Sequence, residues 1–200
     1  MRLAQKMSDL RIVLKESVSH DDISRKARQQ SWELDDIIPR TEKTPLTKIW
    51  TTPDEQTGIH YIEDFYINAR YILIRGKNQD KIAEKIRASL ETYNTYELQE
   101  KLEKVTEKNE CINVILRLSA ASTQDYEPKI FHDLKTMMYA NDADVRKAAI
   151  FSTTYLGWQQ FREPLEELKN NDPDVSVQKF AAVTRASLAK NYWYKQTSSD

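Results

Sequence analysis

Hydrophobic residues are spaced differently in the two parts of the chain, and the difference predicts two kinds of structure. From residue 79 onward, apolar residues recur three or four positions apart, which is the spacing of one face of an amphipathic helix. This spacing predicts helices near 79–93, after Thr95, over 110–121 and from Pro128, a residue type that suits the first turn of a helix. We therefore expect the C-terminal part of the chain to be helical throughout.

Two N-terminal segments also have helical spacing. The leucines and the methionine of residues 3–14 would share one face of a first helix. Ser19 is a good N-cap residue for a second helix, which we expect to include Leu34 and to end before Pro39.

Between these helices lies a segment with the composition of β-structure. Residues 59–76 are dense in β-branched and aromatic side chains, and they are too long for one strand. We predict two strands, near 59–66 and 69–75, with a bend around Asn68. A further short strand is expected in the sequence LTKIWT, residues 46–51.

The C-terminal part contains an internal repeat. The sequence NDADV begins at Asn141, and NDPDV begins thirty residues later at Asn171. The segments that follow, VRKAAIFSTTYLG and VQKFAAVTRASLA, align best with two extra residues in the second copy. In this alignment Ala149 matches Ala181, and both are expected on a buried stripe where a neighbouring helix approaches closely.

The sequence DADVRKAAIFSTTYLG, residues 142–157, resembles the HEAT-repeat family. It is most similar to the short HEAT-like repeats of about 30 residues that are also found in phycobilisome lyases. The resemblance covers about residues 127–190 and implies antiparallel helix pairs. The second copy has Ser176 where the family prefers arginine, which weakens the expectation of an Asp–Arg ladder between adjacent turns. An ordinary helical bundle with a chance duplication is the alternative.

These patterns together predict a mainly α fold, a short HEAT-like α-solenoid that follows an N-terminal segment with a small β element. The expected parts are helices and a β hairpin in 1–78, helical repeats in 79–190 and a C-terminal tail in 191–200. Repeat units bury their faces only by stacking. We therefore expect the N-terminal segment and the tail around Trp193 to cover the two ends.

Charge and composition narrow the classes of function. The chain has 30 basic and 31 acidic side chains, without the basic surplus that nucleic-acid binding requires. No segment has the roughly 18 apolar residues of a membrane span, and the first residues do not resemble a signal peptide. Cys111, the single cysteine, is expected to be a buried structural thiol. We expect a cytoplasmic protein that binds neither nucleic acid nor a membrane.

The sequence HYIED offers the sharpest candidate for chemistry. His60 and Asp64 lie four residues apart on one face of a predicted strand, where they could bind a metal or act as an acid–base pair. A metal site needs three or four ligands, so we favour a solvated strand bend, with no metal and no cofactor, over a metal-dependent enzyme. The resemblance to bilin lyases implies another alternative, in which Asp64, Tyr66 and Arg70 would bind a bilin or the chain would handle phycobilisomes.

The sequence best predicts a non-catalytic protein-interaction module. The side of the helix 143–157 opposite its buried stripe should face solvent, yet it is partly apolar and edged by lysines. Exposed apolar surface with a charged rim is typical of an interaction site. We expect the partner to be another protein chain, a second copy of this one included; the alternative is that the N-terminal segment or the tail covers this side. The predicted partner-binding residues are Lys147, Ile150, Phe151, Thr154, Trp158, Lys179 and Val183.

Overall fold

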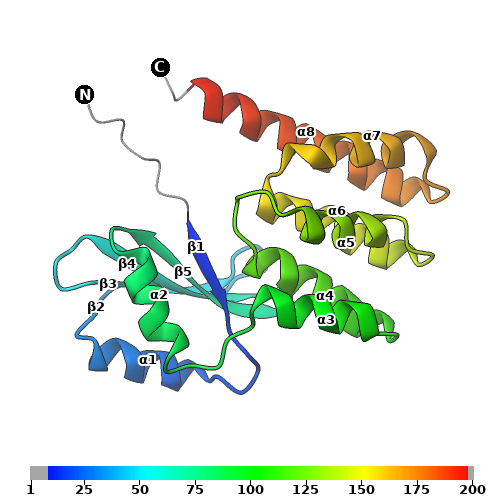
Figure 1. Ribbon diagram of the computed structural model, residues 1–200. Coiled ribbons are helices and arrows are strands. Elements are labelled where there is room, and N and C mark those ends of the chain that lie inside the picture. Colours follow the sequence, from blue (N-terminus) through cyan, green and yellow to red (C-terminus); the bar gives the residue numbers. More distant parts are fainter. Residues whose placement is uncertain (1–8, 198–200) are drawn as a thin grey trace. The chain divides into compact units, whose positions relative to one another are not determined.

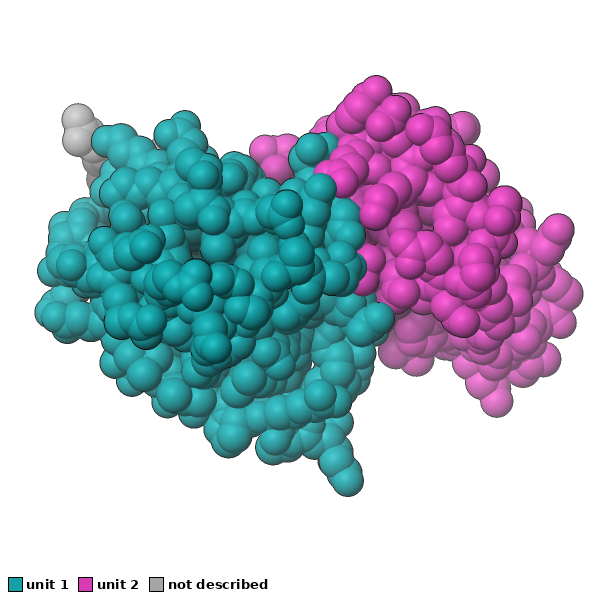
Figure 2. Space-filling model, turned by 90° about the horizontal axis from the view of Figure 1, so that it is seen from below, with its two compact units in different colours: residues 1–94 teal, residues 95–200 magenta. Residues whose placement is uncertain are grey.

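The computed structural model describes the backbone of residues 9–197 and the side chains of residues 9–188 (Figure 1). The chain divides into two compact units, unit 1 (Met1–Asn94) and unit 2 (Thr95–Asp200), which are coloured separately in Figure 2. Within the described residues, unit 1 contains a five-stranded antiparallel sheet, and the whole fold has eight α-helices. The predicted mainly α solenoid is therefore wrong, and the fold is an α/β fold.

The sheet of unit 1 has the strand order β1-β5-β4-β3-β2, and every neighbouring pair is antiparallel. Two of the strands confirm the pair predicted from the aromatic segment, with Asn68 at the positive φ of 46° that the tight turn between them requires. A third confirms the strand LTKIWT. The strands are β1 (Leu10–Val13), β2 (Glu33–Ile38), β3 (Leu46–Thr51), β4 (Thr57–Asp64) and β5 (Ala69–Gly76).

Two segments predicted as helix are strands instead. Residues 10–13 form β1 and pair with β5, with Leu10 opposite Ile74, while residues 1–8 lie outside the described part. The second predicted helix ends early, because Ser31 has a positive φ of 53° and the chain turns there into β2. Leu34 is consequently a strand residue that pairs with Trp50 on β3. Pairing with distant strands outweighs the local helical spacing in both segments.

Two helices cover one face of the sheet. α1 (His20–Gln29) begins with the predicted cap, a reciprocal capping box between Ser19 and Asp22. α2 (Gln79–Arg87) buries Ile82 and Ile86 in the same core as the sheet. Unit 1 therefore extends through this helix to Asn94, past the expected boundary at residue 78. The core that these helices share with the sheet includes Ile12, Ile23, Ala27, Trp50, Ile59, Tyr61, Ile72, Ile74 and Ala83.

Unit 2 consists of consecutive helices that pack in pairs. α3 contacts α4, α5 contacts α6 and α7 contacts α8, and the second members α4, α6 and α8 also contact one another in order (Figure 1). The last helix extends through most of the predicted tail, although the side chains around Trp193 lie outside the described residues. The helices are α3 (Thr95–Lys104), α4 (Lys108–Ala121), α5 (Pro128–Met138), α6 (Ala143–Leu156), α7 (Arg162–Asn171) and α8 (Val175–Thr197), with a 3-10 turn at Gln159–Phe161.

The internal repeat corresponds to equivalent buried stripes on α6 and α8. Ala149 and Ala181 are both fully buried, as the alignment predicts. Small side chains at these positions allow the two helices to contact each other. Cys111, in contrast, is only partly buried, and its burial raises the pKa of the thiol above its ordinary value.

Candidate functional site

The predicted partner-binding face is divided by the structure into an internal part and an external part. Ile150 is fully buried, and Trp158 is only 3% exposed. Helix α6 contacts α4, α5 and α8, so a helix that was expected to bury one stripe buries most of its circumference. Ile150 and Trp158 are therefore core residues, and their assignment to a partner-binding surface is wrong.

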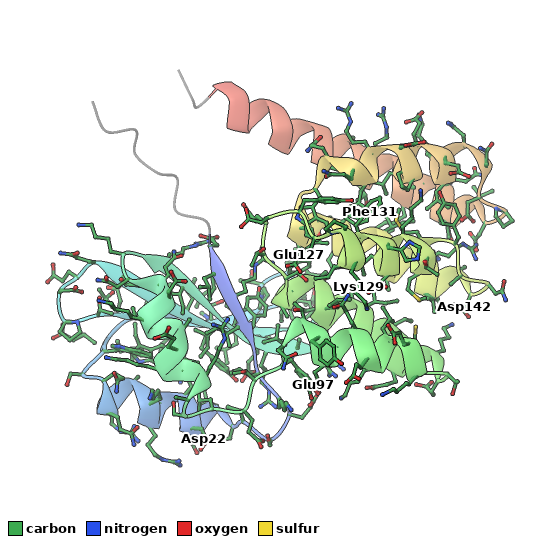
Figure 3. All side chains as sticks on the ribbon, in the orientation of Figure 1. Asp22, Glu97, Glu127, Lys129, Phe131 and Asp142 are labelled. Carbon is green, nitrogen blue, oxygen red and sulfur yellow. The ribbon has the colours of Figure 1, made fainter. Side chains whose placement is uncertain are left out.

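Trp158 belongs to an aromatic cluster at one end of α5 and α6. Gly157 ends α6 with a left-handed φ of 67°, which turns the next residue inward. The indole Nε1 of Trp158 donates a hydrogen bond of 2.9 Å to the carbonyl of Gln124. Its ring contacts Tyr126 and stacks on Phe161, which in turn contacts Phe131, labelled in Figure 3. This cluster closes the core and leaves no indole surface for a partner.

The external part of the face centres on an aromatic pair between α6 and α8. The rings of Phe151 and Phe180 are stacked with centroids 6.4 Å apart, and Tyr155 contacts Phe151 edge-on at 5.8 Å. All three residues are partly buried rather than enclosed. Phe180 and Tyr155 were absent from the predicted set. Their signal in the sequence is the helical spacing of Tyr155 from Phe151 and of Phe180 from Val183.

An exposed aliphatic residue extends this aromatic pair. Val183 lies one turn beyond Phe180 on α8 and is 65% exposed. Thr154 is also exposed, and its hydroxyl donates to the carbonyl of Phe151 within the helix. We call the surface formed by Phe151, Thr154, Tyr155, Phe180 and Val183 the α6–α8 patch.

Two lysines lie at the rim of the α6–α8 patch. Lys147 lies one turn before Phe151, 3.8 Å from the carboxylate of Asp144, and Lys179 is exposed beside Phe180 in the sequence. The pKa of Asp174 lies below its ordinary value, because Ser176 donates hydrogen bonds to this carboxylate and the positive charge of Lys147 adds a smaller effect. The apolar surface edged by lysines is smaller than the predicted one, because Ile150 and Trp158 are buried.

A buried ion pair connects the turns that begin α6 and α8. The Nε and Nη2 atoms of Arg146 donate to the two carboxylate oxygens of Asp172, each at 2.8 Å, and both side chains are almost fully buried. Nη1 of Arg146 donates to the carbonyls of Ala140 and Asn141. In the second copy, Ser176 bonds instead to Asp174 in its own turn. The ion pair therefore links α6 to the turn that begins α8, the two helices that carry the α6–α8 patch.

The turn before α6 is equivalent to the turn before α8, but its aspartate pairs with a lysine instead of an arginine. Asp142, labelled in Figure 3, accepts hydrogen bonds from the backbone of Asp144 and Val145 and caps α6. Lys108, at the start of α4, forms an ion pair of 3.2 Å with Asp142 and another ion pair with Asp144. The Lys108–Asp142 ion pair thus links α4 to the turn before α6, as the Arg146–Asp172 ion pair links α6 to the turn before α8.

Beside the Arg146–Asp172 ion pair lies a hollow of about 300 Å³ between consecutive turns. The hydroxyl of Tyr139 donates a 2.6 Å hydrogen bond to the carboxylate of Glu167 at its wall, and burial together with this carboxylate raises the pKa of Tyr139. Asn141, Asn171 and Pro173 also line it. The polar groups that line it bond mainly to one another.

The HYIED residues do not form a catalytic or metal-binding pair. His60 and Asp64 share a strand, but four residues of strand span about 13 Å, which is too far for one metal ion. Asp64 is 6% exposed, and it accepts hydrogen bonds from the backbone of Tyr66 and the hydroxyl of Tyr71. These bonds close the turn after β4. Among the described residues, no group of three or more His, Cys, Asp or Glu side chains could hold a metal ion.

The three residues considered for a bilin are engaged separately within unit 1. Asp64 holds the turn after β4, as described above. The hydroxyl of Tyr66, a residue that is 52% exposed, donates to the carbonyl of Lys43, and Arg70 donates to the carbonyl of Glu16. Their polar groups have different partners, so the structure does not bring them together as one binding site.

Comparison with protein-family models, with curated proteins and with solved structures gives no match. None of the helices within the described residues has the length and apolar character that crossing a membrane requires. The geometry of the α6–α8 patch is therefore the best guide to function.

Proposed function

We propose that the chain is a non-catalytic protein-binding module and that another protein docks on the α6–α8 patch. The observation that carries the proposal is the exposure of Val183, at 65%, beside the stacked rings of Phe151 and Phe180. Aromatic side chains with neighbouring aliphatic residues are typical anchors of protein interfaces. The side chains that provide this surface come from two helices that contact each other and are linked by the buried Arg146–Asp172 ion pair.

The rim of the patch indicates the chemistry of the partner. Lys147 is paired with Asp144, whereas Lys179 is exposed and adds positive charge at the edge of an apolar centre. A complementary surface therefore carries apolar side chains with Asp or Glu facing Lys179. In a symmetric contact between two copies, the lysine rims would face each other. We therefore propose a different protein as the partner, and self-association is an outcome that the experiment below distinguishes.

Three broader statements belong to this proposal. A cytoplasmic location is supported by the single cysteine, which cannot form an internal disulfide. A relationship of residues 127–190 to short HEAT-like repeats, within an α/β fold, is supported by the repeated turns that Arg146 and Asp172 connect. A partner that is a protein rather than a nucleic acid is supported by the balance of 30 basic and 31 acidic side chains.

Site-directed photo-crosslinking in the native cell tests the proposal. A photoreactive residue at Thr154, inside the patch, should capture a specific protein, whereas one at Tyr96 on α3, which is 70% exposed, serves as the control. Val183→Glu should abolish capture at Thr154 and leave the melting temperature nearly unchanged. Capture of the same proteins from both positions, or capture that Val183→Glu does not alter, would contradict the proposal; a crosslinked second copy would show self-association instead.

A further inference from the structure

The outer strand of the sheet, β2, has an unpaired side. β2 ends the strand order, and all six of its residues are exposed. Three of them are large and apolar: Leu34 is 54% exposed, Ile37 46% and Ile38 37%. An exposed edge of this kind presents free backbone groups that can pair with a strand from another chain.

The hairpin between β3 and β4 shows which backbone groups of β2 point outward. The N–H of Thr52 donates a hydrogen bond to the carbonyl of Thr57 and closes the turn of this hairpin. Backbone groups alternate in direction along a strand, so those of Trp50, Lys48 and Leu46 point toward β4. Those of Thr51, Ile49 and Thr47 form a second set that points toward β2. Ile49 belongs to the second set, and its partner Asp36 therefore points its backbone inward. The next residue, Ile37, consequently points its N–H away from the sheet.

A β-bulge at Asp35 determines which side chains of β2 share a face. The register shifts between Leu34 and Asp36, so Leu34 and Ile37 pair with Trp50 and Lys48, on the helix-covered face of the sheet. The opposite face carries the two carboxylates that precede them, Glu33 and Asp36, which pair with Thr51 and Ile49. The face of Leu34 and Ile37 is therefore apolar, and the opposite, acidic face carries Glu33 and Asp36 together with Ile38, which pairs with Thr47.

The outward N–H of Ile37 is already occupied. Oδ1 of Asp36 accepts a hydrogen bond of 2.7 Å from it. Glu33, Asp35 and Asp36 form no ion pair with any side chain that the structure describes. A carboxylate thus covers the backbone donor that a neighbouring strand would use, and no described side chain supplies this carboxylate with a cation.

We propose that β2 binds an extended segment of another protein, in which lysine or arginine alternates with apolar residues, as an antiparallel sixth strand. A cation on the acidic face draws the carboxylate of Asp36 away from Ile37, whose N–H then donates to the incoming backbone. The apolar residues of the segment cover Leu34 and Ile37. A strand without positive charge meets an edge that remains blocked.

The same charges disfavour a second copy of this chain as the occupant. Antiparallel pairing of two β2 strands about the centre of ELDDII places Asp35 opposite Asp36. Like charges directly opposite each other destabilise paired strands. The proposal is independent of the α6–α8 patch, because β2 lies in unit 1 and the patch lies in unit 2.

A labelled peptide of alternating valine and lysine tests the proposal by fluorescence anisotropy with the unaltered protein. In an antiparallel pair, residues directly opposite Leu34 and Ile37 share their face and exchange hydrogen bonds with them. N-methylation of the valines should therefore weaken binding at least tenfold, whereas N-methylation of the lysines should change it less than threefold. Both peptides keep every charge, so the difference separates strand pairing from simple charge attraction.

Two further arms complete the experiment. Replacement of the peptide lysines by glutamate should abolish binding, and Ile37→Pro, which removes an outward N–H without changing any charge, should weaken it at least tenfold. Val183→Glu in the α6–α8 patch should leave peptide binding unchanged. The proposal is overturned if the lysine peptide does not bind, if methylated valines are tolerated, if the glutamate peptide binds equally, or if sedimentation shows a dimer that Ile37→Pro disrupts.

Discussion

Arg146 on α6 and Asp172 in the turn before α8 form a buried ion pair with two parallel hydrogen bonds of 2.8 Å. The side chain of Arg146 is 8% exposed and that of Asp172 is 1% exposed. Asp172 also accepts a bond from the backbone of Asp174, so one carboxylate connects two helical pairs and shapes the turn that begins α8.

Removal of Asp172 should destabilise unit 2 strongly. Asp172→Ala leaves a buried guanidinium without its anion, and breaking such a pair costs about 3–5 kcal/mol. Urea denaturation followed by circular dichroism measures the loss. Asp144→Ala is the control, since it removes an exposed partner of Lys108 and should cost about 0–1 kcal/mol. Similar losses in the two variants would show that the Arg146–Asp172 pair contributes little.

Enlargement of the buried small-residue stripe should also destabilise the helix contact. Ala181 is fully buried on α8, a helix that contacts α6 and α7, so Ala181→Leu should cost about 1–3 kcal/mol through overpacking. Ala186→Leu on the same helix makes the same change at an exposed position, where the two residues have similar helix propensities. Its effect should be within about 0.5 kcal/mol. Equal melting temperatures for both variants would show that the stripe is not tightly packed.

Shortening a side chain should destabilise the protein strongly in the buried part of the predicted partner face and hardly at all in its exposed part. Ile150→Ala creates a cavity in the core and should cost about 2–5 kcal/mol. Val183→Ala should change stability by no more than about 0.5 kcal/mol, because the side chain is mostly in water. Chemical denaturation of both variants measures the difference. A large destabilisation by Val183→Ala would mean that this residue is covered within the chain and is unavailable to a partner.

His60 should make folding depend on pH near neutrality. Burial, and to a smaller extent the charge of Arg75, lowers the pKa of His60 below its ordinary value of 6.5. Above pH 6.5 the imidazole is neutral in both states. As the pH falls below 6.5, the unfolded chain binds the proton first, so stability falls until the pH reaches the lower folded pKa.

The His60→Gln variant should lose this part of the pH dependence. Urea midpoints at pH 7.5 and pH 5.5 should differ less for the variant than for the wild type, and the nuclear magnetic resonance titration of His60 should have a midpoint below 6.5. A titration midpoint above 6.5, or an identical pH dependence in the variant, would contradict the assigned environment.

Several elements follow from the sequence because local signals agree with long-range ones. The aromatic and β-branched residues of β4 and β5 favour strands, and the strands pair with each other across a turn at Asn68. The capping box at Ser19 starts α1, and the repeated stripe predicts the burial of Ala149 and Ala181. Each signal lies within a few residues of the structure that it predicts.

Other features depend on contacts between residues far apart in the sequence. Leu10–Val13 has helical spacing, yet it pairs with β5 about sixty residues later, and no local pattern records that pairing. Ile150 is internal because α6 contacts other helices on several sides, whereas periodicity identified only one of those sides. The sequence by itself therefore determined which segments of unit 2 are helical and which stripe is buried. The tertiary structure alone decided strands β1 and β2, the strand order of the sheet, the Arg146–Asp172 pair and the exposed residues of the α6–α8 patch, because hydrogen bonding and burial between distant segments select among locally acceptable conformations.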